Sequence, residues 1–568
     1  MSARSVLRWL GSVRPERRHL RADAVAGLPG AISSVPDGMA CAVLAGVNPI
    51  HGLYASFAGP VGGGLTSSTR LMVITTTGAA SLAAGSAIED VNPAERPQAL
   101  FLLTVIAGAV MVLAGVARLG RYTRFVSHSV MIGFLTGIAV NIVFGQLADL
   151  TGAEAGGEFA VAKAIDVVAH PSRIDLASLV TGLAALGILI GLSRTRLSAV
   201  SALVALAIPT AGVIIAAADR VARVKDAGDI PRGIPLPQLP DLSQLSASVV
   251  TGALAVAAIV LVQGSGVAEA APNRDGTASN PNQDFIAQGT GNIVSALFRG
   301  QPVGGSVGQT AINRAAGGRT RWAAIWSGLW MLAILAAFSG VVGLVAMPTL
   351  AAVLIFAAVR ALRFAEVTSI LRTGLTSQIA VVTTFCATLF LPVAAAVGIG
   401  VALSLLLQLN QEAMDLKVVQ LSPAPGDRWK EQPPPKRLPN HRVTVLDVYG
   451  SLFYAGSRTL QVRLPDPVGA EAPTVVLRLR GRTSLGATFV KVVAEYSAAL
   501  EAVGGRLYLS GVDREVADLL RRTGHVDVSG PVGIFEATEL VGESTEQALR
   551  AAETWAVQQR RGTSDPDR

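Results

Sequence analysis

Long runs of apolar residues without a single charge dominate the chain. They include Phe101 to Val116, Leu179 to Leu192, Val249 to Val262, Met331 to Val345 and Ile379 to Leu409. The hydrocarbon core of a bilayer is about 30 Å thick, and a helix needs roughly 20 apolar residues to cross it. The pattern therefore predicts a polytopic α-helical membrane protein.

Fourteen hydrophobic segments are distinguishable, and each is a predicted span. Two of them, Val73 to Ala84 and Ser306 to Ala316, are short and rich in Gly, Ser and Thr. They fall at corresponding places in two sets of seven, as interrupted helices do at the midplane site of an inverted-repeat transporter. The predicted segments start near residues 24, 51, 72, 98, 125, 174, 197, 246, 283, 305, 321, 343, 376 and 393.

Each short segment is expected to be a half-helix that follows an extended stretch, at residues 71–74 and 302–305. Its N-terminal amides are expected to face those of the other half-helix. Unpaired amides and the helix dipole attract anions, so the pair is a candidate anion site. The alternative is that both segments are ordinary close-packed helices of small residues.

The character of the chain changes after residue 411. Residues 412–439 are rich in Pro, Lys and Arg, which indicates a linker. Residues 440–558 predict a small α/β domain, and residues 559–568 a disordered tail. The predicted strands of the α/β domain are His441 to Tyr449, Ser451 to Tyr454, Thr474 to Leu479 and Arg506 to Ser510. Its predicted helices are Gly486 to Ala502, Arg514 to Thr523 and Ser544 to Val557.

Composition and charge agree with a membrane protein. The chain is 51% hydrophobic and only 15% charged, with a formal net charge of +8. The basic residues cluster beside predicted spans, as the positive-inside rule requires, so the basic N-terminus (residues 1–22) is expected in the cytoplasm and nucleic acid is not an expected partner. Arginines that fit this topology are Arg70, Arg118, Arg121, Arg124, Arg194, Arg196, Arg314, Arg319, Arg321, Arg360, Arg363 and Arg372.

The residue types that catalysis or a cofactor would need are sparse. The two cysteines, Cys41 and Cys386, lie inside apolar runs and predict neither a disulfide framework nor a metal cluster. The sequence contains no phosphate-binding loop of the Gly-x4-Gly-Lys-Ser/Thr type. We therefore expect no enzymatic activity, no cofactor and no ATP hydrolysis.

Five stretches carry a resemblance to known families. The run from Asp23 to Leu53 resembles the first span and following loop of SulP anion permeases, and Gly291 to Asn313 resembles their ninth and tenth spans. The patterns at Leu452 to Gly456, Val475 to Gly486 and Leu507 to Gly524 resemble a STAS domain.

The resemblance implies an architecture and a function. It implies fourteen spans in a seven-plus-seven inverted repeat (residues 23–411), divided into core and gate subdomains, and a cytoplasmic STAS domain. It further implies a homodimer in the cell (inner) membrane with cytoplasmic termini. The implied function is secondary active transport of a small anion of the sulfate, bicarbonate or dicarboxylate class by an elevator-like motion.

The resemblance also maps the binding residues. The half-helix N-termini map to Thr75, Thr76 and Thr77 and to Ser306, Val307 and Gly308. Their backbone amides and hydroxyls are candidate ligands of an oxyanion.

Three positions depart from the family pattern. Asp37 stands where the family often has Gln, Gln263 where it usually has an acid, and Gln309 where an Arg is common. Burial favours the neutral form of a carboxyl group, so Asp37 is a candidate proton carrier for transport coupled to protons; sodium is another candidate coupling ion. The alternative is that Asp37 caps a broken helix or pairs with a buried Arg.

These departures bear on the substrate. A site that gains one acid, lacks another acid and lacks a base suits a monovalent, weakly hydrated or neutral substrate better than sulfate. Two further functions stay open: a membrane-anchored sensor or regulator with a degenerate transport site, and a neutral-solute permease of the same fold. In the STAS-like region, Ser484 is a candidate for regulatory phosphorylation, with helix capping as the simpler role.

Overall fold

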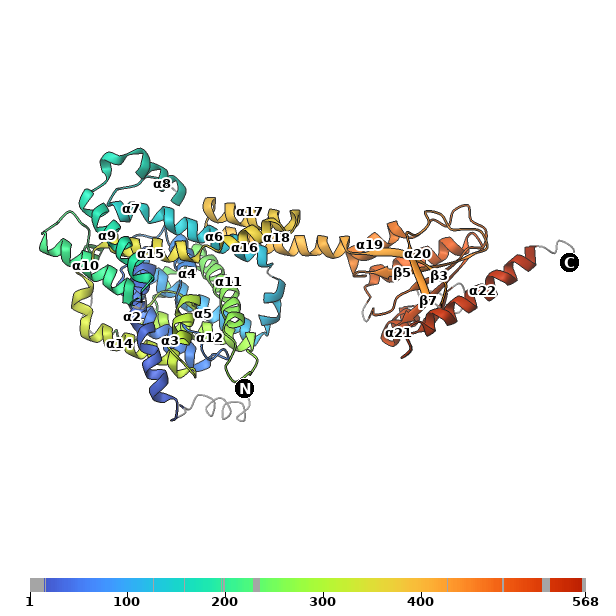
Figure 1. Cartoon of the computed structure of the whole chain (residues 1–568), viewed down its shortest axis with the longest axis horizontal. Coiled ribbons are helices and arrows are strands. Elements are labelled where there is room, and N and C mark those ends of the chain that lie inside the picture. The colour runs from blue at the N-terminus through green and yellow to red at the C-terminus, as the bar shows by residue number, and fades with distance from the viewer. Residues whose placement is uncertain are drawn as a thin grey trace. The chain divides into compact units, whose positions relative to one another are not determined.

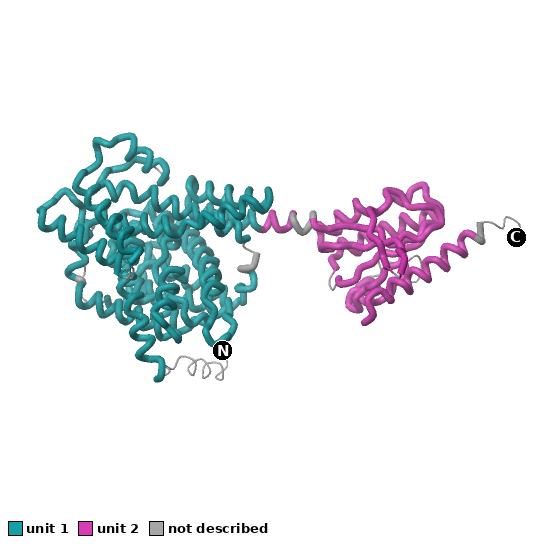
Figure 2. The backbone as a smooth tube through the Cα atoms, in the orientation of Figure 1, with its two compact units in different colours: residues 1–404 teal, residues 405–568 magenta. Residues whose placement is uncertain are grey.

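The computed structural model describes residue 15 and residues 17–125, 127–157, 159–195, 197, 200–227, 235–426, 428–482, 485–523 and 532–563. The chain divides into two compact units, residues 1–404 and 405–568 (Figure 2). The first unit is helical and contains one short two-stranded ladder, and the second is built on a six-stranded sheet (Figure 1). Each unit has its own hydrophobic core.

The helices of the first unit begin where the hydropathy pattern predicts. Each of the fourteen predicted segments has a helix, or a short strand followed by a helix, within about four residues of its expected start. The elements are α2 (Leu20–Leu44), α3 (Ile50–Thr66), β1 (Ile74–Thr76), α4 (Gly78–Ala87), α5 (Arg96–Val116), α6 (His128–Gly145), α7 (Leu147–Thr151), α8 (Ala160–Ala169), α9 (Leu176–Ser193), α10 (Ser201–Ile215), α11 (Ala247–Ala270), α12 (Pro281–Leu297), β2 (Val303–Gly305), α13 (Val307–Ala315), α14 (Trp322–Val342), α15 (Met347–Ala361), α16 (Phe364–Leu371), α17 (Leu375–Phe390) and α18 (Val393–Met414).

Among the described residues, four helices are long and apolar enough to cross a membrane by length and composition. They are Arg96–Val116, His128–Thr151, Leu176–Ser193 and Ala247–Ala270. Several other helices are apolar but shorter, such as Ser201–Ile215 and Leu375–Phe390.

The helices of the first unit fall into two packing groups. In one group α12 packs along α5 and α3, α14 packs on α2 and α3, and α11 contacts α4 and α5. In the other, α6 packs on α17 and α15, and α9 packs on α10 and α15. The order helix, helix, strand, short helix, helix occurs twice in the first group, once from α2 to α5 and again from α11 to α14.

Glycines allow the helices of the first group to approach closely. A Cβ atom on Gly108 of α5 would lie 2.8 Å from the carbonyl oxygen of Gly289 on α12, and one on Gly289 would lie 2.6 Å from that of Gly108. A Cβ on Gly52 of α3 would lie 1.7 Å from the carbonyl oxygen of Gly38 on α2. Such contacts are typical of membrane helices, where small residues bring two backbones together.

The second unit is an α/β domain whose sheet has the strand order β4-β3-β5-β6-β7-β8. Strands β5 to β8 run parallel, and β3 pairs antiparallel with β4 and β5. Side chains such as Phe489 and Leu500 of α20 form the core with the sheet. The elements are β3 (Lys417–Ala424), β4 (Arg428–Gln432), β5 (Val443–Tyr449), α19 (Tyr454–Arg463), β6 (Thr474–Arg478), α20 (Ala487–Glu501), β7 (Arg506–Val512), α21 (Arg514–Thr523), β8 (Val532–Glu536) and α22 (Glu543–Thr563).

Several local predictions for this unit need correction. The predicted strand at Ser451 to Tyr454 is wrong, because α19 begins at Tyr454. Residues 417–424 and 428–432, assigned to a linker on composition, form the paired strands β3 and β4 at the edge of the sheet, where Val418 and Val419 are buried. Helix α22 continues to Thr563, inside the segment predicted as a disordered tail. Thr483 and Ser484 lie outside the described residues.

A buried tyrosine predicts how the second unit responds to alkaline pH. The hydroxyl of Tyr496 on α20 donates a hydrogen bond to the carbonyl oxygen of Pro465 at 2.9 Å, and burial raises the pKa of this phenol. Because the pKa is higher in the folded than in the unfolded state, about 10, the associated stability is present below pH 10 and is lost as the pH rises above it.

We therefore expect Tyr496→Phe to cost about 1 kcal/mol near neutral pH but to flatten the loss of stability above about pH 10. Urea unfolding of the C-terminal unit, followed by circular dichroism between about pH 7 and 11, measures both effects. Parallel pH profiles for the two proteins would show that Tyr496 does not contribute to the alkaline loss.

Candidate functional site

Two strands far apart in the sequence form a short antiparallel ladder inside the first unit. Ile74, Thr75 and Thr76 of β1 pair with Gly305, Gly304 and Val303 of β2, respectively. The amide of Ser306 donates to the carbonyl oxygen of Val73 at 2.9 Å, which extends the ladder beyond its last pair. The amide of Val73 in turn donates to the hydroxyl of Thr310 at 3.0 Å. The ladder joins the two segments that the sequence singled out as interrupted helices.

A short helix follows each strand, and each begins with a hydroxyl cap. The side chain of Thr77 caps α4 by accepting from the amide of Ala80, and Ser306 caps α13 by accepting from the amide of Gln309 at 3.3 Å. Short polar side chains at this position satisfy amides that have no partner within the helix. Both short segments are therefore strand–helix units, and the alternative of two ordinary close-packed helices is wrong.

The antiparallel register sets where the two helix starts lie. Because Thr76 faces Val303 and Ile74 faces Gly305, α4 and α13 leave the ladder from its opposite ends. The cap residues Thr77 and Ser306 are therefore four strand steps apart, roughly 13 Å at the strand rise per residue. The two N-termini flank one ladder, and the expectation that they face each other across the site stays a prediction. Thr75 and Thr76 belong to β1 rather than to a helix start, and the hydroxyls of both are buried with no hydrogen-bond partner among the residues that the structure describes.

Three side-chain amides hold the outer edge of β2. Asn292 of α12 accepts from the amide of Val303 at 3.0 Å and donates to its carbonyl oxygen at 2.7 Å. Gln288, one turn earlier on α12, accepts from the amide of Gly305 at 3.2 Å, and Gln263 of α11 donates to the carbonyl oxygen of Gly305 at 3.3 Å.

Alternate residues of a strand point their backbone groups to the same side, so Val303 and Gly305 present four such groups away from β1. We call Gln263, Gln288 and Asn292 the amide clamp. The clamp satisfies all four groups in a region where water is scarce. Sequence reasoning missed Gln288 and Asn292, although two amides four residues apart in a helix lined with small residues were a usable signal.

The first turn of α13 is the open end of this arrangement. Val307 is 47% exposed, and a Cβ atom on Gly308 would meet nothing within 4 Å. By contrast, a Cβ on Gly78, the first residue of α4, would lie 3.1 Å from the side chain of Ile142. The start of α13 is therefore the more accessible of the two predicted anion-binding turns.

Asp37 lies beside this turn and is bonded to Gln309. The side-chain amide of Gln309 donates to the carboxylate of Asp37 at 2.9 Å and to the hydroxyl of Ser33 at 2.8 Å. Helix α2 is continuous from Leu20 to Leu44, so Asp37 does not cap a broken helix. Its side-chain partner is the amide of Gln309 rather than a buried Arg. The structure thus brings Asp37 and Gln309 together.

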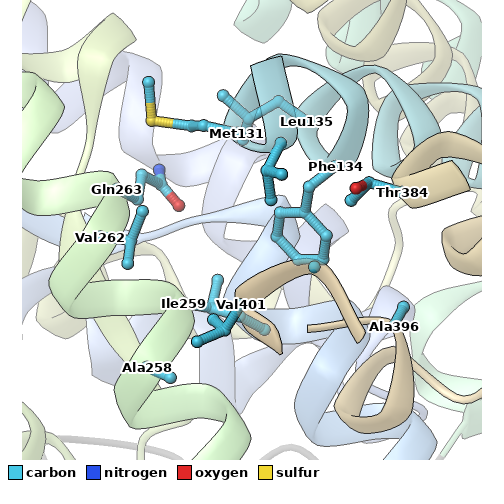
Figure 3. A pocket seen from close by; sticks show the side chains of 12 residues that line it. Met131, Phe134, Leu135, Ala258, Ile259, Val262, Gln263, Thr384, Ala396 and Val401 are labelled. Carbon is cyan, nitrogen blue, oxygen red and sulfur yellow. The ribbon is translucent and has the colours of Figure 1, made fainter. Parts of the chain in front are cut away.

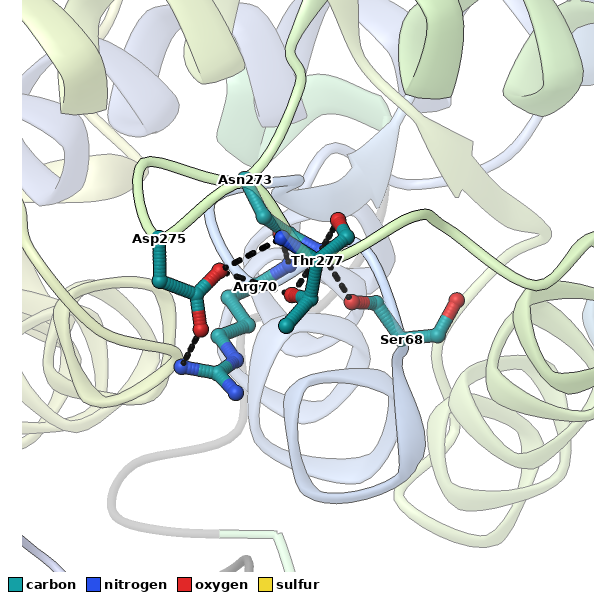
Figure 4. Close-up of polar contacts among 5 residues, drawn as sticks. All are labelled: Ser68, Arg70, Asn273, Asp275 and Thr277. Carbon is teal, nitrogen blue, oxygen red and sulfur yellow. Dashed lines mark hydrogen bonds and ion pairs between the residues drawn. The ribbon is translucent and has the colours of Figure 1, made fainter.

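The connection that leads into β1 is fixed by polar groups of α12 and of the segment before it. Asp284 of α12 accepts from the amides of Ser68 and Thr69 at 2.7 and 3.0 Å and from the hydroxyl of Thr69 at 2.6 Å. Asn273 donates to the carbonyl oxygen of Ser68 at 3.1 Å, and Arg70 forms an ion pair with Asp275 at 2.9 Å (Figure 4).

The segment before α14 is held in the same way. Asp23 of α2 accepts from the amides of Arg319 and Thr320 at 2.7 and 3.2 Å. A buried carboxylate therefore anchors one connection in each half of the first group.

An apolar pocket, partly open to solvent, lies next to the clamp. It is formed by α6, α11, α17 and α18, and Gln263 of the clamp lines it (Figure 3). The hydroxyl of Thr384 donates to the carbonyl oxygen of Ala380 in its own helix at 2.8 Å. The Oε1 atom of Gln263, by contrast, is buried and finds no hydrogen-bond partner within the described ranges. The lining residues are Val130, Met131, Phe134, Leu135, Ala258, Ile259, Val262, Gln263, Thr384, Ala396, Gly400 and Val401.

Relatives in sequence match the chain over most of its length. It is 28% identical to a "Probable sulfate transporter" of Mycobacterium tuberculosis over 535 residues, which cover 92% of this chain and 94% of the relative. It is 24% identical to a "Putative sulfate transporter" of Bacillus subtilis over 519 residues, 90% of this chain and 96% of the relative.

Solved structures share the fold at lower sequence identity. The murine anion transporter Slc26a9 in the inward-facing state aligns with a TM-score of 0.82 at 20% identity, over 97% of this chain and 94% of that one. The transmembrane domain of the cyanobacterial bicarbonate transporter BicA aligns with a TM-score of 0.58 at 20% identity, over 69% of this chain and 98% of that one.

Profiles of two families match separate parts of the chain. The STAS domain profile matches residues 435–539, within the second unit. The sulfate permease family profile matches residues 20–387, which include the ladder, the amide clamp and Asp37. The chain therefore belongs to the sulfate permease family and carries a C-terminal STAS domain, as the sequence resemblance predicted.

Proposed function

We propose that this protein is a secondary transporter that moves a small anion across the cell membrane by alternating access. The observation that carries the proposal is the ladder of β1 and β2 with a capped, open helix start at Ser306. Amides at a helix start bind anions, and a site between two interrupted helices is typical of inverted-repeat carriers. The names of the relatives, sulfate and bicarbonate transporters, support an anion as substrate.

The motion we propose is elevator-like. The ladder, the clamp and Asp37 belong to the packing group of α2 to α5 and α11 to α14, which would form the moving core, and the group of α6, α9, α10, α15 and α17 would form the gate. The recurring order of elements supports an inverted repeat with two halves of seven spans each. We further propose a homodimer in the inner membrane with both termini in the cytoplasm, as the arginine distribution favours.

Coupling to protons through Asp37 follows from its neighbours. The side-chain partner of its carboxylate is the neutral amide of Gln309, and among the described residues no cation bonds to this carboxylate. A substrate anion beside an ionised Asp37 would be repelled, whereas a protonated Asp37 would admit it. A monovalent anion carried with one proton therefore fits this site better than sulfate does.

Asp37→Asn tests the coupling. In proteoliposomes, we expect an inward proton gradient to accelerate uptake of a labelled monovalent anion by the wild-type protein. Uptake by Asp37→Asn should be independent of the gradient, because the amide mimics the protonated acid and cannot release a proton. Saturable sulfate uptake that Asp37→Asn abolishes would contradict the monovalent assignment. Gradient-driven uptake that persists in the variant would remove Asp37 from the coupling step.

Two other functions predict different results in the same preparation. A sensor with a degenerate transport site would bind ligand, and so gain thermal stability with ligand concentration, but would show no net flux. A neutral-solute permease would be stabilised by nucleobases such as uracil rather than by anions. A thermal-shift screen against oxyanions, halides, dicarboxylates and nucleobases, followed by flux measurements, separates the three functions.

A further inference from the structure

We propose that the substrate is a small monocarboxylate that carries a hydroxyl group beside its carboxylate and a short apolar tail, such as a 2-hydroxy acid. This inference rests on the proposed transport function and specifies the substrate of the same site. Three neighbouring features of the first unit carry it: the open turn of α13, the free acceptor of Gln263 and the apolar pocket that Gln263 lines.

The carboxylate is assigned to the first turn of α13. This turn is exposed at Val307 and Gly308. Among the groups described around it, Gln309 and Asp37 bond to each other and neither is a cation. Backbone amides without an adjacent cation suit one negative charge better than two. The head group is therefore a monoanion.

The hydroxyl group is assigned to Gln263. The Nε2 atom of this side chain is already committed, because it donates to the carbonyl oxygen of Gly305 at 3.3 Å. Its Oε1 atom remains: it is buried and has no partner in the part of the chain that the structure describes. Buried acceptors are nearly always paired, so a ligand that brings a donor to this atom gains over one that does not. Because Gly305 directly precedes the cap residue Ser306, a donor next to the carboxylate is well placed to reach Gln263.

The apolar tail is assigned to the pocket between α6, α11, α17 and α18. Figure 3 shows the carboxamide of Gln263 on the α11 wall of the pocket, with Phe134 and Thr384 on other elements that line it. Thr384 donates its hydroxyl to its own helix. Among the lining residues, Gln263 has a buried polar atom without a partner in the described part of the chain, and a ligand in the pocket would have to reach that atom at the wall. Sulfate is polar on every side, so contact with apolar walls does not increase its affinity. An alkyl group gains binding free energy because its apolar surface is removed from water.

Paired ligands test the three assignments on the full-length protein in detergent micelles. We expect 2-hydroxybutanoate to bind roughly tenfold more tightly than butanoate by isothermal titration, because of the hydroxyl group. Each methylene from 2-hydroxypropanoate to 2-hydroxypentanoate should add roughly fourfold until the pocket is full. Formate and sulfate serve as head groups without a tail.

Two variants separate the hydroxyl from the tail. Gln263→Leu should reduce the ratio of hydroxy-acid to deoxy-acid affinity to near one, while the gain per methylene persists. The ratio is taken within one protein, so a general weakening of binding cancels. Ala258→Phe fills the pocket from α11 and should remove the gain per methylene but keep the hydroxyl preference. Leu254→Phe, on the same helix at a site 49% exposed and outside the lining, is the matched control and should change neither.

The outcomes distinguish this inference from the proposed function. If formate or bicarbonate binds and is transported but neither the hydroxyl nor the tail adds affinity, the inference is overturned and the transport function stands. Sulfate binding more tightly than every monocarboxylate also overturns it. Equal binding of butanol and butanoate would overturn it in favour of a pocket for lipid chains. If no anion binds or is transported, the proposed function itself fails.

Discussion

Replacing Asn292 by leucine is expected to abolish uptake and to destabilise the transport unit more than any other single change in the amide clamp. The variant leaves both the amide and the carbonyl oxygen of Val303 without a partner. Each unpaired backbone group in a buried site costs about 1 to 3 kcal/mol, so the loss is on the order of 2 to 6 kcal/mol. Strand β2 would then lose its register, and with it the position of Ser306 and the open turn.

Thermal unfolding of the purified protein and uptake in proteoliposomes measure the two effects. Asn292→Asp keeps an acceptor for the amide of Val303 and should recover part of the stability. Thr104→Val on α5 is the matched control, because this buried hydroxyl bonds only to the carbonyl oxygen of Leu100 in its own helix. Full activity of Asn292→Leu would show that the clamp does not position β2.

Gly52→Ala is expected to prevent the correct packing of α2 on α3. The added methyl group would lie 1.7 Å from the carbonyl oxygen of Gly38, and backbone atoms cannot move aside as a side chain can. Overpacking of this kind costs about 1 to 3 kcal/mol where the structure relaxes, and more where it does not. Because Asp37 directly precedes Gly38, separating the helices also moves the carboxylate away from Gln309.

Expression yield and the melting temperature of the purified protein report this change. Gly187→Ala on α9 is the matched control, since a Cβ atom there meets nothing within 4 Å. Alanine is the better helix former by about 0.5 to 1 kcal/mol, so the control should be neutral or slightly stabilising. A Gly52→Ala protein as stable as the wild type would mean that α2 and α3 tolerate a wider spacing.

The placement of helices in the first unit was predictable because lipid leaves few choices. A backbone in hydrocarbon must satisfy its own hydrogen bonds, so apolar runs become helices, and their starts follow from hydropathy alone. The two short segments were recognisable for the opposite reason, since Gly, Ser and Thr interrupt the apolar pattern. The family followed from motifs at both ends of the chain, and the profile matches confirm it.

The contacts within the site were beyond such reasoning. The bond between Asp37 and Gln309 joins positions 272 residues apart, and nothing in either local sequence specifies it. Gln288 and Asn292 form hydrogen bonds with backbone groups of β2, and a prediction made span by span cannot identify such a contact. In the second unit, the β3–β4 hairpin has a composition typical of linkers, and its sequence alone does not predict strands. These residues form strands because β3 pairs with β5 at the edge of the sheet.

The ladder of β1 and β2 constrains any motion of the carrier. Its backbone hydrogen bonds tie the first half of the chain to the second at the site itself, so neither half can shift its binding groups alone. In the elevator-like motion proposed above, a solute bound there would move together with both strands. The side on which it is released would then depend on the position of these strands relative to the helices proposed as the gate.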